Sequence, residues 1–98
     1  MARRVRLTPR YLTDARRCGV LGGTPESRDV KQVIDALAGA GADSFDTDMY
    51  AYVPGENDAV RVLAHGRRVR QRNLWLWYWA KDDELTLVAL TNLPPVAR

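Results

Sequence analysis

The chain alternates between two kinds of hydrophobic spacing, and each kind predicts its own elements. Near the start, Val5 and Leu7 alternate with arginines, which is the period-two pattern of a half-buried strand. Further along, four apolar residues recur at the i, i+3, i+4, i+7 spacing of an amphipathic helix. These four are Val30, Val33, Ile34 and Leu37. Period-two spacing then returns after residue 60. The pattern predicts a strand, a helical section and several further strands.

Both predicted helices begin with threonine followed by proline. The threonine hydroxyl caps free backbone N–H groups, and proline fits the first helical position because it has no N–H to satisfy. The first helix is predicted from Pro9 to Cys18, with Leu12 and Ala15 facing inward. The second begins at Thr24 and ends at Gly39, since glycine favours helix termination. Two helices joined by a glycine-rich turn form a helical hairpin.

The second half of the chain predicts three or four antiparallel strands. The segment MYAYV, at positions 49–53, reads as a strand within a stretch that is otherwise unassigned. Alternation from Val60 to Arg72 predicts a strand on which Arg68, Arg70 and Arg72 share one face. The segments 73–80 and 85–91 follow as strands joined by the turn KDDE. The fold class is therefore α+β: a strand, a two-helix hairpin and an antiparallel sheet, in one domain over residues 1–98.

The aromatic segment at positions 73–80 is apolar on both faces of its predicted strand. Leu74, Leu76 and Tyr78 point one way, and Trp75, Trp77 and Trp79 point the other. The helical hairpin accounts for one row. The tryptophan row needs a different cover, because a contiguous exposed tryptophan face would be a large apolar patch. More of this chain, a partner protein and a nucleic acid are the three candidate covers.

Composition places the chain among globular proteins, with 46% apolar and 28% charged residues. No apolar run reaches the roughly 20 residues of a membrane-spanning helix. No apolar region follows the basic start MARRVRLTPR, so no signal peptide is predicted and a cytoplasmic location is expected. The single cysteine, Cys18, has no internal disulfide partner.

The net charge is +3, and Lys31 and Lys81 are the only lysines among 15 basic residues. Arginine suits phosphate binding and base stacking, so the bias is compatible with a nucleic-acid partner. A GC-rich genome would produce the same bias. Asp43, Asp46 and Asp48 lack the glycine and glutamate of a calcium loop, so no metal and no cofactor are predicted.

Three segments, in order, resemble the RelE/ParE superfamily of toxins from toxin–antitoxin systems, closest to its YafQ and HigB branch. The first is RRVRLTPRYLTDARR, similar to a strand that feeds a basic helix. The second is DVKQVIDALAGAG, similar to the second helix of that branch. The third is NLWLWYWAKDDELTLVALTN, similar to its paired closing strands. The resemblance implies a RelE-like microbial RNase fold.

The resemblance also implies a function. Such toxins are ribosome-dependent mRNA endonucleases, in which the 2′-hydroxyl attacks the adjacent phosphate without a metal. Basic side chains orient the phosphate, and an acid and a base transfer protons. The implied partners are a cognate antitoxin protein, the ribosome and its mRNA.

Site residues are expected on the sheet face opposite the helices. Candidate catalytic residues are His65, Arg68, Arg70 and Arg72. Candidate nucleic-acid contacts are Arg4, Arg6, Arg67 and Lys81. His65 is the only histidine, and histidine is the residue type most often used as a general acid or base, although a solvated loop position is the other interpretation. For the arginines, the other interpretation is a solvated strand face.

The chain departs from the YafQ and HigB pattern after its last strand. That branch has a histidine or tyrosine there, whereas LTNLPPVAR has neither. The departure favours a ParE-like toxin that inhibits DNA gyrase by protein binding and needs no catalytic base. A non-catalytic protein-binding module on the same fold is a further alternative.

Overall fold

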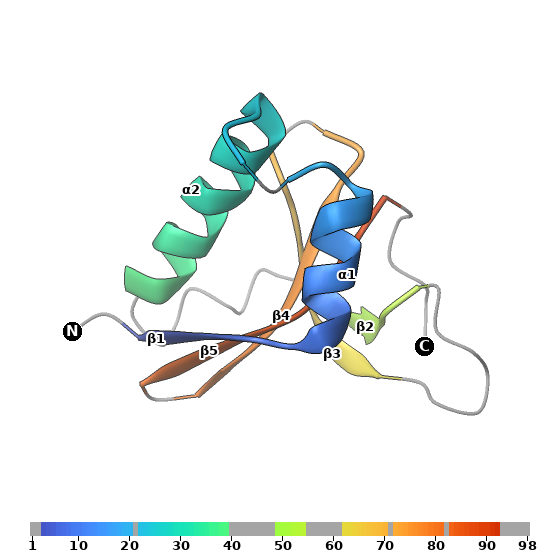
Figure 1. Cartoon of the computed structure of the whole chain (residues 1–98). Coiled ribbons are helices and arrows are strands. Elements are labelled where there is room, and N and C mark those ends of the chain that lie inside the picture. Colours follow the sequence, from blue (N-terminus) through green and yellow to red (C-terminus); the bar gives the residue numbers. More distant parts are fainter. Residues whose placement is uncertain are drawn as a thin grey trace.

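The computed structural model describes residues 3–20, 22–39, 49–54, 62–70, 72–81 and 83–92. Its elements follow the predicted order, a strand, two helices and a series of strands (Figure 1). They are β1 (Arg4–Leu7), α1 (Pro9–Arg17), α2 (Pro25–Gly39), β2 (Met49–Tyr52), β3 (Leu63–Arg68), β4 (Trp75–Lys81) and β5 (Glu84–Thr91). The predicted α+β class is confirmed. The three aspartates at positions 43, 46 and 48 lie outside the described residues.

The strands form one sheet in the order β1-β5-β4-β3-β2. The last four strands are antiparallel to one another, as predicted. The first strand is parallel to β5, with Val5 opposite Leu85 and Leu7 opposite Leu87. The period-two pattern predicted β1 as a strand but not its parallel partner, because alternation carries no information on pairing direction. β5 is therefore hydrogen-bonded along both edges.

Thr8 joins β1, α1 and β5 at one point. Its side-chain oxygen accepts a hydrogen bond from the backbone N–H of Tyr11, 3.2 Å away, which caps α1. The same hydroxyl donates to the carbonyl oxygen of Leu87 at 2.9 Å. The helix therefore starts at a fixed place on β5, and the predicted cap is confirmed.

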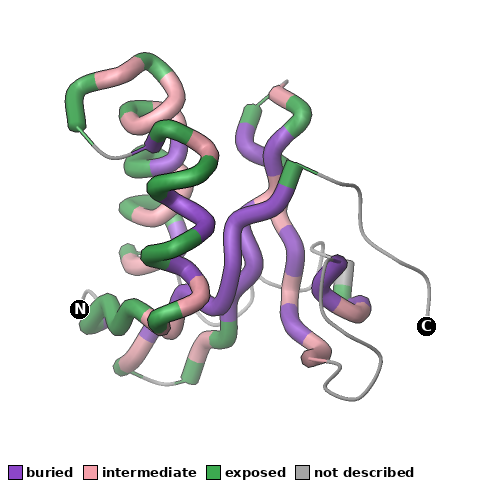
Figure 2. The backbone as a smooth tube through the Cα atoms, turned by 45° about the vertical axis from the view of Figure 1, so that its right-hand side comes forward, coloured by how far each residue is buried: buried purple, intermediate pink, exposed green. Residues whose placement is uncertain are grey.

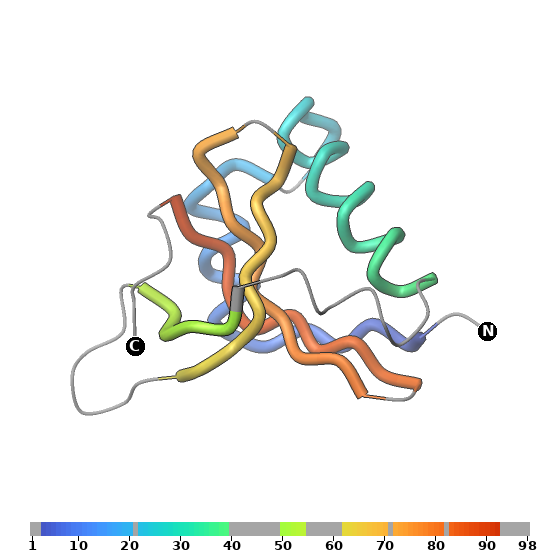
Figure 3. Tube along the Cα trace, turned by 180° about the vertical axis from the view of Figure 1, so that it is seen from behind, coloured from blue at the N-terminus to red at the C-terminus, as the bar shows by residue number. Residues whose placement is uncertain are grey.

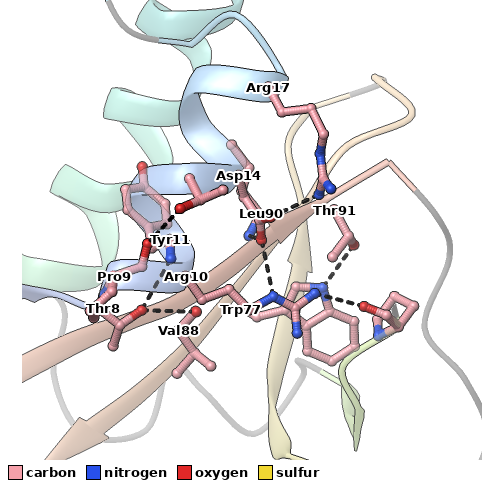
Figure 4. A network of polar contacts seen from close by, with 12 residues as sticks. Thr8, Pro9, Arg10, Tyr11, Asp14, Arg17, Trp77, Val88, Leu90 and Thr91 are labelled. Atoms are coloured by element: carbon pink, nitrogen blue, oxygen red, sulfur yellow. Dashed lines mark hydrogen bonds and ion pairs between the residues drawn. The ribbon is translucent and has the colours of Figure 1, made fainter. Parts of the chain in front are cut away.

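α1 packs Tyr11 and Ala15 against the sheet, while Leu12 is exposed. The prediction that Leu12 faces inward was therefore wrong, because its neighbour Tyr11 takes the inward position. The physical reason is the buried carboxylate of Asp14, which accepts hydrogen bonds from the backbone N–H of Leu90 at 3.1 Å and from Arg17 at 2.7 Å (Figure 4). This bond to β5 sets the rotation of the helix.

The helices cover one face of the sheet. Leu74, Leu76 and Tyr78 of the aromatic segment belong to the helix-side core, as predicted. In α2, Val30 and Leu37 are buried, so the ends of the predicted stripe pack fully and its middle is half-buried. Buried residues are concentrated in β4 and β5, which run through the centre of the sheet (Figure 2). Neither described helix is long and apolar enough to cross a membrane.

The tryptophan row lies on the other face, called the helix-free face here because no described helix covers it (Figure 3). Trp77 is fully buried there, and its indole N–H donates to Thr91 at 3.0 Å. The surrounding apolar cluster consists of Ala51, Val53, Ala64, Val88 and Ala89. Trp77 is therefore covered by other residues of this chain.

A register shift between β4 and β5 allows this packing. The pairing moves from Trp77 opposite Ala89 to Tyr78 opposite Leu87, which leaves Val88 as an extra residue on β5. Such a bulge reverses the inside–outside alternation along its strand. Leu87 and Leu90 consequently both face the helices, while Val88 and Ala89 both face Trp77.

Substituting Gly66 with alanine tests the contact with Trp77. An added Cβ would lie 3.0 Å from the indole ring, and overpacking costs roughly 1–3 kcal/mol. This exceeds the roughly 0.5–1 kcal/mol gained by removing a strand glycine. Gly66→Ala should therefore lower the midpoint of urea unfolding. Gly39→Ala, which adds a Cβ with no atom within 4 Å, is the control and should not lower it; equal midpoints for the two variants would contradict the packing described.

Candidate functional site

Trp79 is the exposed member of the tryptophan row, with 43% of its surface accessible. Its indole N–H donates to the carbonyl oxygen of Leu63 on β3 at 2.7 Å. This hydrogen bond holds the pyrrole edge against β3 and fixes the ring's orientation. An exposed aromatic ring that is already immobilised loses little conformational entropy when a ligand stacks on it.

Two rows of side chains cross the helix-free face beside Trp79. Register places Arg6, Thr86 and Trp79 in one row over β1, β5 and β4. The neighbouring row is Arg4, Glu84 and Lys81. Cross-strand neighbours on one face lie roughly 4.5–5.5 Å apart. Three of the four predicted nucleic-acid contacts, Arg4, Arg6 and Lys81, therefore share one surface with an exposed aromatic ring.

These rows border a groove of about 640 Å³, here called the Trp79 groove. Its lining residues are Arg6, Thr8, Trp79, Lys81, Asp83, Glu84 and Thr86. The arginines of β1 have weak carboxylate contacts, Arg4 with Asp83 at 3.8 Å and Arg6 with Glu84 at 3.7 Å. Exposed pairs at such distances contribute little to stability, so the arginine side chains can turn towards a ligand at small cost.

His65 lies in β3, and the loop interpretation of this residue was wrong. Its ring lies between tyrosines on neighbouring strands: it stacks on Tyr78, with centroids 5.5 Å apart, and is tilted against Tyr50, with centroids 4.9 Å apart. Nδ1 is buried without a hydrogen-bond partner among the described residues. Because His65 pairs with Tyr78, which belongs to the helix-side core, its side chain lies on the face opposite the Trp79 groove.

Arg68 and Arg67 end β3 on opposite faces. Arg68 lies on the helix-free face, with its Cζ 5.6 Å from the centre of the Trp75 ring and its Nε donating to the Arg72 carbonyl oxygen. Trp75 and Lys81 are the two ends of β4, six residues apart, or roughly 20 Å at strand spacing. Arg68 is therefore remote from the Trp79 groove. Arg67 pairs with Leu76 and faces the helix side, away from Arg4, Arg6 and Lys81.

Arg70 and Arg72 do not extend the strand, which corrects the predicted shared face. β3 ends at Arg68, and Arg70 adopts a left-handed backbone with φ of 53°. Both side chains reach α2 instead. Arg72 Nε lies 2.6 Å from Asp29, and Arg70 lies 3.3 Å from the same carboxylate. Arg72 also contacts Glu26 at 3.2 Å.

The Arg72–Asp29 contact perturbs the carboxyl group. Hydrogen bonding from Arg72 lowers the pKa of Asp29 below its ordinary value, with a further contribution from Arg70. A carboxylate stabilised in this way contributes stability that depends on its ionisation. The contacts show that these two arginines fasten the β3–β4 turn to α2.

The four predicted catalytic residues therefore lie in three places. His65 is on the helix side, Arg68 is at the far end of the helix-free face, and Arg70 and Arg72 are at the turn beside α2. The prediction extended the alternating pattern too far, since β3 ends before Arg70.

Burial raises the pKa of Cys18, which agrees with a structural role for that thiol. Within the described ranges, no group of three histidine, cysteine or acidic side chains could hold a metal ion.

Trp79, Glu84 and Thr86 were not singled out from the sequence as a site. The aromatic cluster was recognised, but its three tryptophans look alike in the sequence. Only the cover over Trp77 and the hydrogen bond of Trp79 distinguish a core residue from a surface residue.

Comparison with known proteins shows a shared fold. The chain is similar to a solved structure of a copper-bound mutant toxin from Helicobacter pylori, with a TM-score of 0.58 and 20% sequence identity. The similarity covers 92% of each chain. No protein-family model and no curated protein matches the sequence. The arrangement of strands and helices is therefore that of the Helicobacter pylori toxin.

Asp29→Asn should change how stability depends on pH. Because the pKa of Asp29 is lower in the folded chain than its ordinary 3.8, the stabilisation is fully present above about pH 5 and is lost as pH falls through the folded value. Wild type should unfold at higher urea concentration than Asp29→Asn at pH 7, and the difference should shrink below about pH 4. Urea unfolding at several pH values measures this.

Asp35→Asn is the matched control on the same helix. Asp35 pairs with Lys31 at 2.9 Å, and both side chains are mostly exposed, so its removal should have little effect at any pH. A difference between wild type and Asp29→Asn that persists unchanged at pH 2.5 would contradict the assigned ion pair.

Proposed function

We propose that this chain is the toxin of a toxin–antitoxin pair and that it acts by binding RNA in the Trp79 groove. The observation that carries the proposal is an exposed, immobilised tryptophan beside Arg6 and Lys81. Stacking of one base on an aromatic ring contributes roughly 1–3 kcal/mol, and nearby cations attract the phosphates. The fold shared with a Helicobacter pylori toxin supports the toxin role.

RNA binding is the part of the proposal that the geometry supports best. The finer proposal, metal-free cleavage of ribosome-bound mRNA, needs an acid and a base beside the attacked phosphate. The single histidine, His65, is the residue type most often used as such an acid or base. It lies on the face opposite the groove, so cleavage would require RNA to pass around the β2–β3 side of the sheet.

A second candidate is a toxin that inhibits a protein such as DNA gyrase. The observation in its favour is the use of Arg70 and Arg72 in ion pairs with α2. Asp29 holds both guanidinium groups. Two of the four predicted catalytic residues are therefore not placed to contact a phosphate. Inhibition by protein binding needs no such set.

The free edge of β1 supports a protein partner, which in this proposal is the antitoxin. β1 pairs with β5 on one side, and no described strand pairs with its other side. Val5 and Leu7 project from this strand and are exposed, as is Leu12 on the following helix. An edge strand with exposed apolar side chains is a template for an added strand from another chain.

Trp79→Ala should weaken binding of single-stranded RNA by about ten-fold, because it removes the stacking surface. Trp79→Phe should retain most of the affinity, since it keeps an aromatic face without the hydrogen bond to Leu63. Tyr50→Ala is the matched control, because Tyr50 is equally exposed, at 42%, on the opposite face. Fluorescence anisotropy of a labelled oligoribonucleotide measures the affinities, and expression in a bacterial host measures growth arrest. Equal RNA affinity of wild type and Trp79→Ala would rule out the groove as the binding site.

His65→Ala separates the finer proposals. The endonuclease version predicts cleaved transcripts in expressing cells and their disappearance in His65→Ala. The protein-binding version predicts intact transcripts, a DNA-damage response and growth arrest that persists in His65→Ala. Transcript sequencing with a damage-response reporter distinguishes the two outcomes, and Tyr52→Phe on the adjacent strand serves as the control for expression.

A further inference from the structure

The Trp79 groove has balanced charge, which a general phosphate-binding surface does not need. Arg6 and Lys81 contribute two positive charges to its lining, and Asp83 and Glu84 contribute two negative charges. Each carboxylate repels a nucleic-acid backbone and reduces affinity for it. A ligand that fits this lining has hydrogen-bond donors for the carboxylates as well as phosphates for the cations.

Glu84 is the carboxylate placed to contact a stacked base. Its side chain is 34% exposed, whereas that of Asp83 is 79% exposed. The hydroxyl of Thr86, which lies opposite Trp79, donates to Glu84 Oε1 at 3.4 Å. This bond holds Glu84 towards Thr86, the cross-strand neighbour of Trp79, while Asp83 is largely exposed.

A role in stability does not account for Glu84. Its ion pair with Arg6 is 3.7 Å long, and the arginine side chain is 73% exposed, so the pair contributes little to folding. The carboxylate lies between Arg4 and Lys81 in the cross-strand row.

Guanine is the base whose edge matches a carboxylate. Its ring N–H and its exocyclic amine are adjacent donors that meet both carboxylate oxygens. Adenine and cytosine present an amine beside an acceptor, and uracil presents one N–H between two carbonyls. A carboxylate next to an acceptor is repelled, which disfavours these three bases.

We propose that the Trp79 groove selects guanine: the base stacks on Trp79, its donor edge binds Glu84, and Arg6 contacts a flanking phosphate. The proposal rests on the proposed RNA-binding function and specifies the base that this function recognises. It assigns Glu84 to specificity and Arg6 to affinity, so the two side chains have separable effects.

The test uses four tetranucleotides, UUGU, UUAU, UUCU and UUUU, with 2′-O-methyl riboses that 2′-hydroxyl attack cannot cleave. Wild type should bind the guanine-containing oligonucleotide about ten-fold more tightly than the other three, as expected for a charge-assisted hydrogen-bond pair. Glu84→Gln should abolish this preference. Asp83→Asn removes the same charge one residue away and should retain it. Arg6→Ala should bind each of the four oligonucleotides more weakly than wild type, by a similar factor, and should keep the preference for guanine.

The outcomes separate this inference from the proposed function. Equal affinity of wild type for all four oligonucleotides overturns guanine selection and leaves RNA binding intact. Failure to bind any of them overturns RNA binding in the groove as well. Loss of preference in Asp83→Asn with retention in Glu84→Gln overturns the assignment to Glu84. The wild-type comparison needs no variant, so it decides the question even for a Glu84→Gln chain that does not fold.

Discussion

The parallel pairing of β1 with β5 is the contact on which the other features depend. It sets Arg4 beside Glu84 and Arg6 beside Thr86, and so supplies one wall of the Trp79 groove. It also brings Thr8 to Leu87, where one hydroxyl caps α1 and bonds to the central strand. The same strand pairing therefore determines both the position of α1 on the sheet and the residues that line the Trp79 groove. Substitutions that weaken this pairing would affect both faces of the sheet.

The bulge in β5 divides the helix-free face into two parts. Around the bulge, Val88 and Ala89 both face Trp77 and close that end with apolar contacts. At the other end, beyond Trp79, the same face has charged and hydroxyl side chains and remains open. One strand thus carries a buried tryptophan and an exposed one, although the sequence around them is nearly uniform. Packing at one end of β4 leaves the other end for a ligand.

Local signals in the sequence predicted the elements, and distant contacts decided the site. Thr8 and Thr24 correctly predicted the starts of the two helices, because helix capping depends only on neighbouring residues. The rotation of α1 was misjudged because Asp14 is held by β5, far away in sequence. Arg70 and Arg72 were assigned to a strand face because alternation was extended past the strand's end, and their partners lie on α2. Arg4, Arg6 and Lys81 lie on one face of the sheet, yet nothing local identified Trp79 as the exposed ring.

The hydroxyl of Thr8 and the carbonyl of Leu87 are separated by 79 positions in the chain. A contact of such long range forms only after the intervening polypeptide exists, and closing so large a loop delays folding. During translation β1 therefore cannot pair until its partner strand, β5, has been synthesised. The Trp79 groove, whose lining includes Arg6 of β1 and Thr86 of β5, is therefore complete only after these two strands have paired.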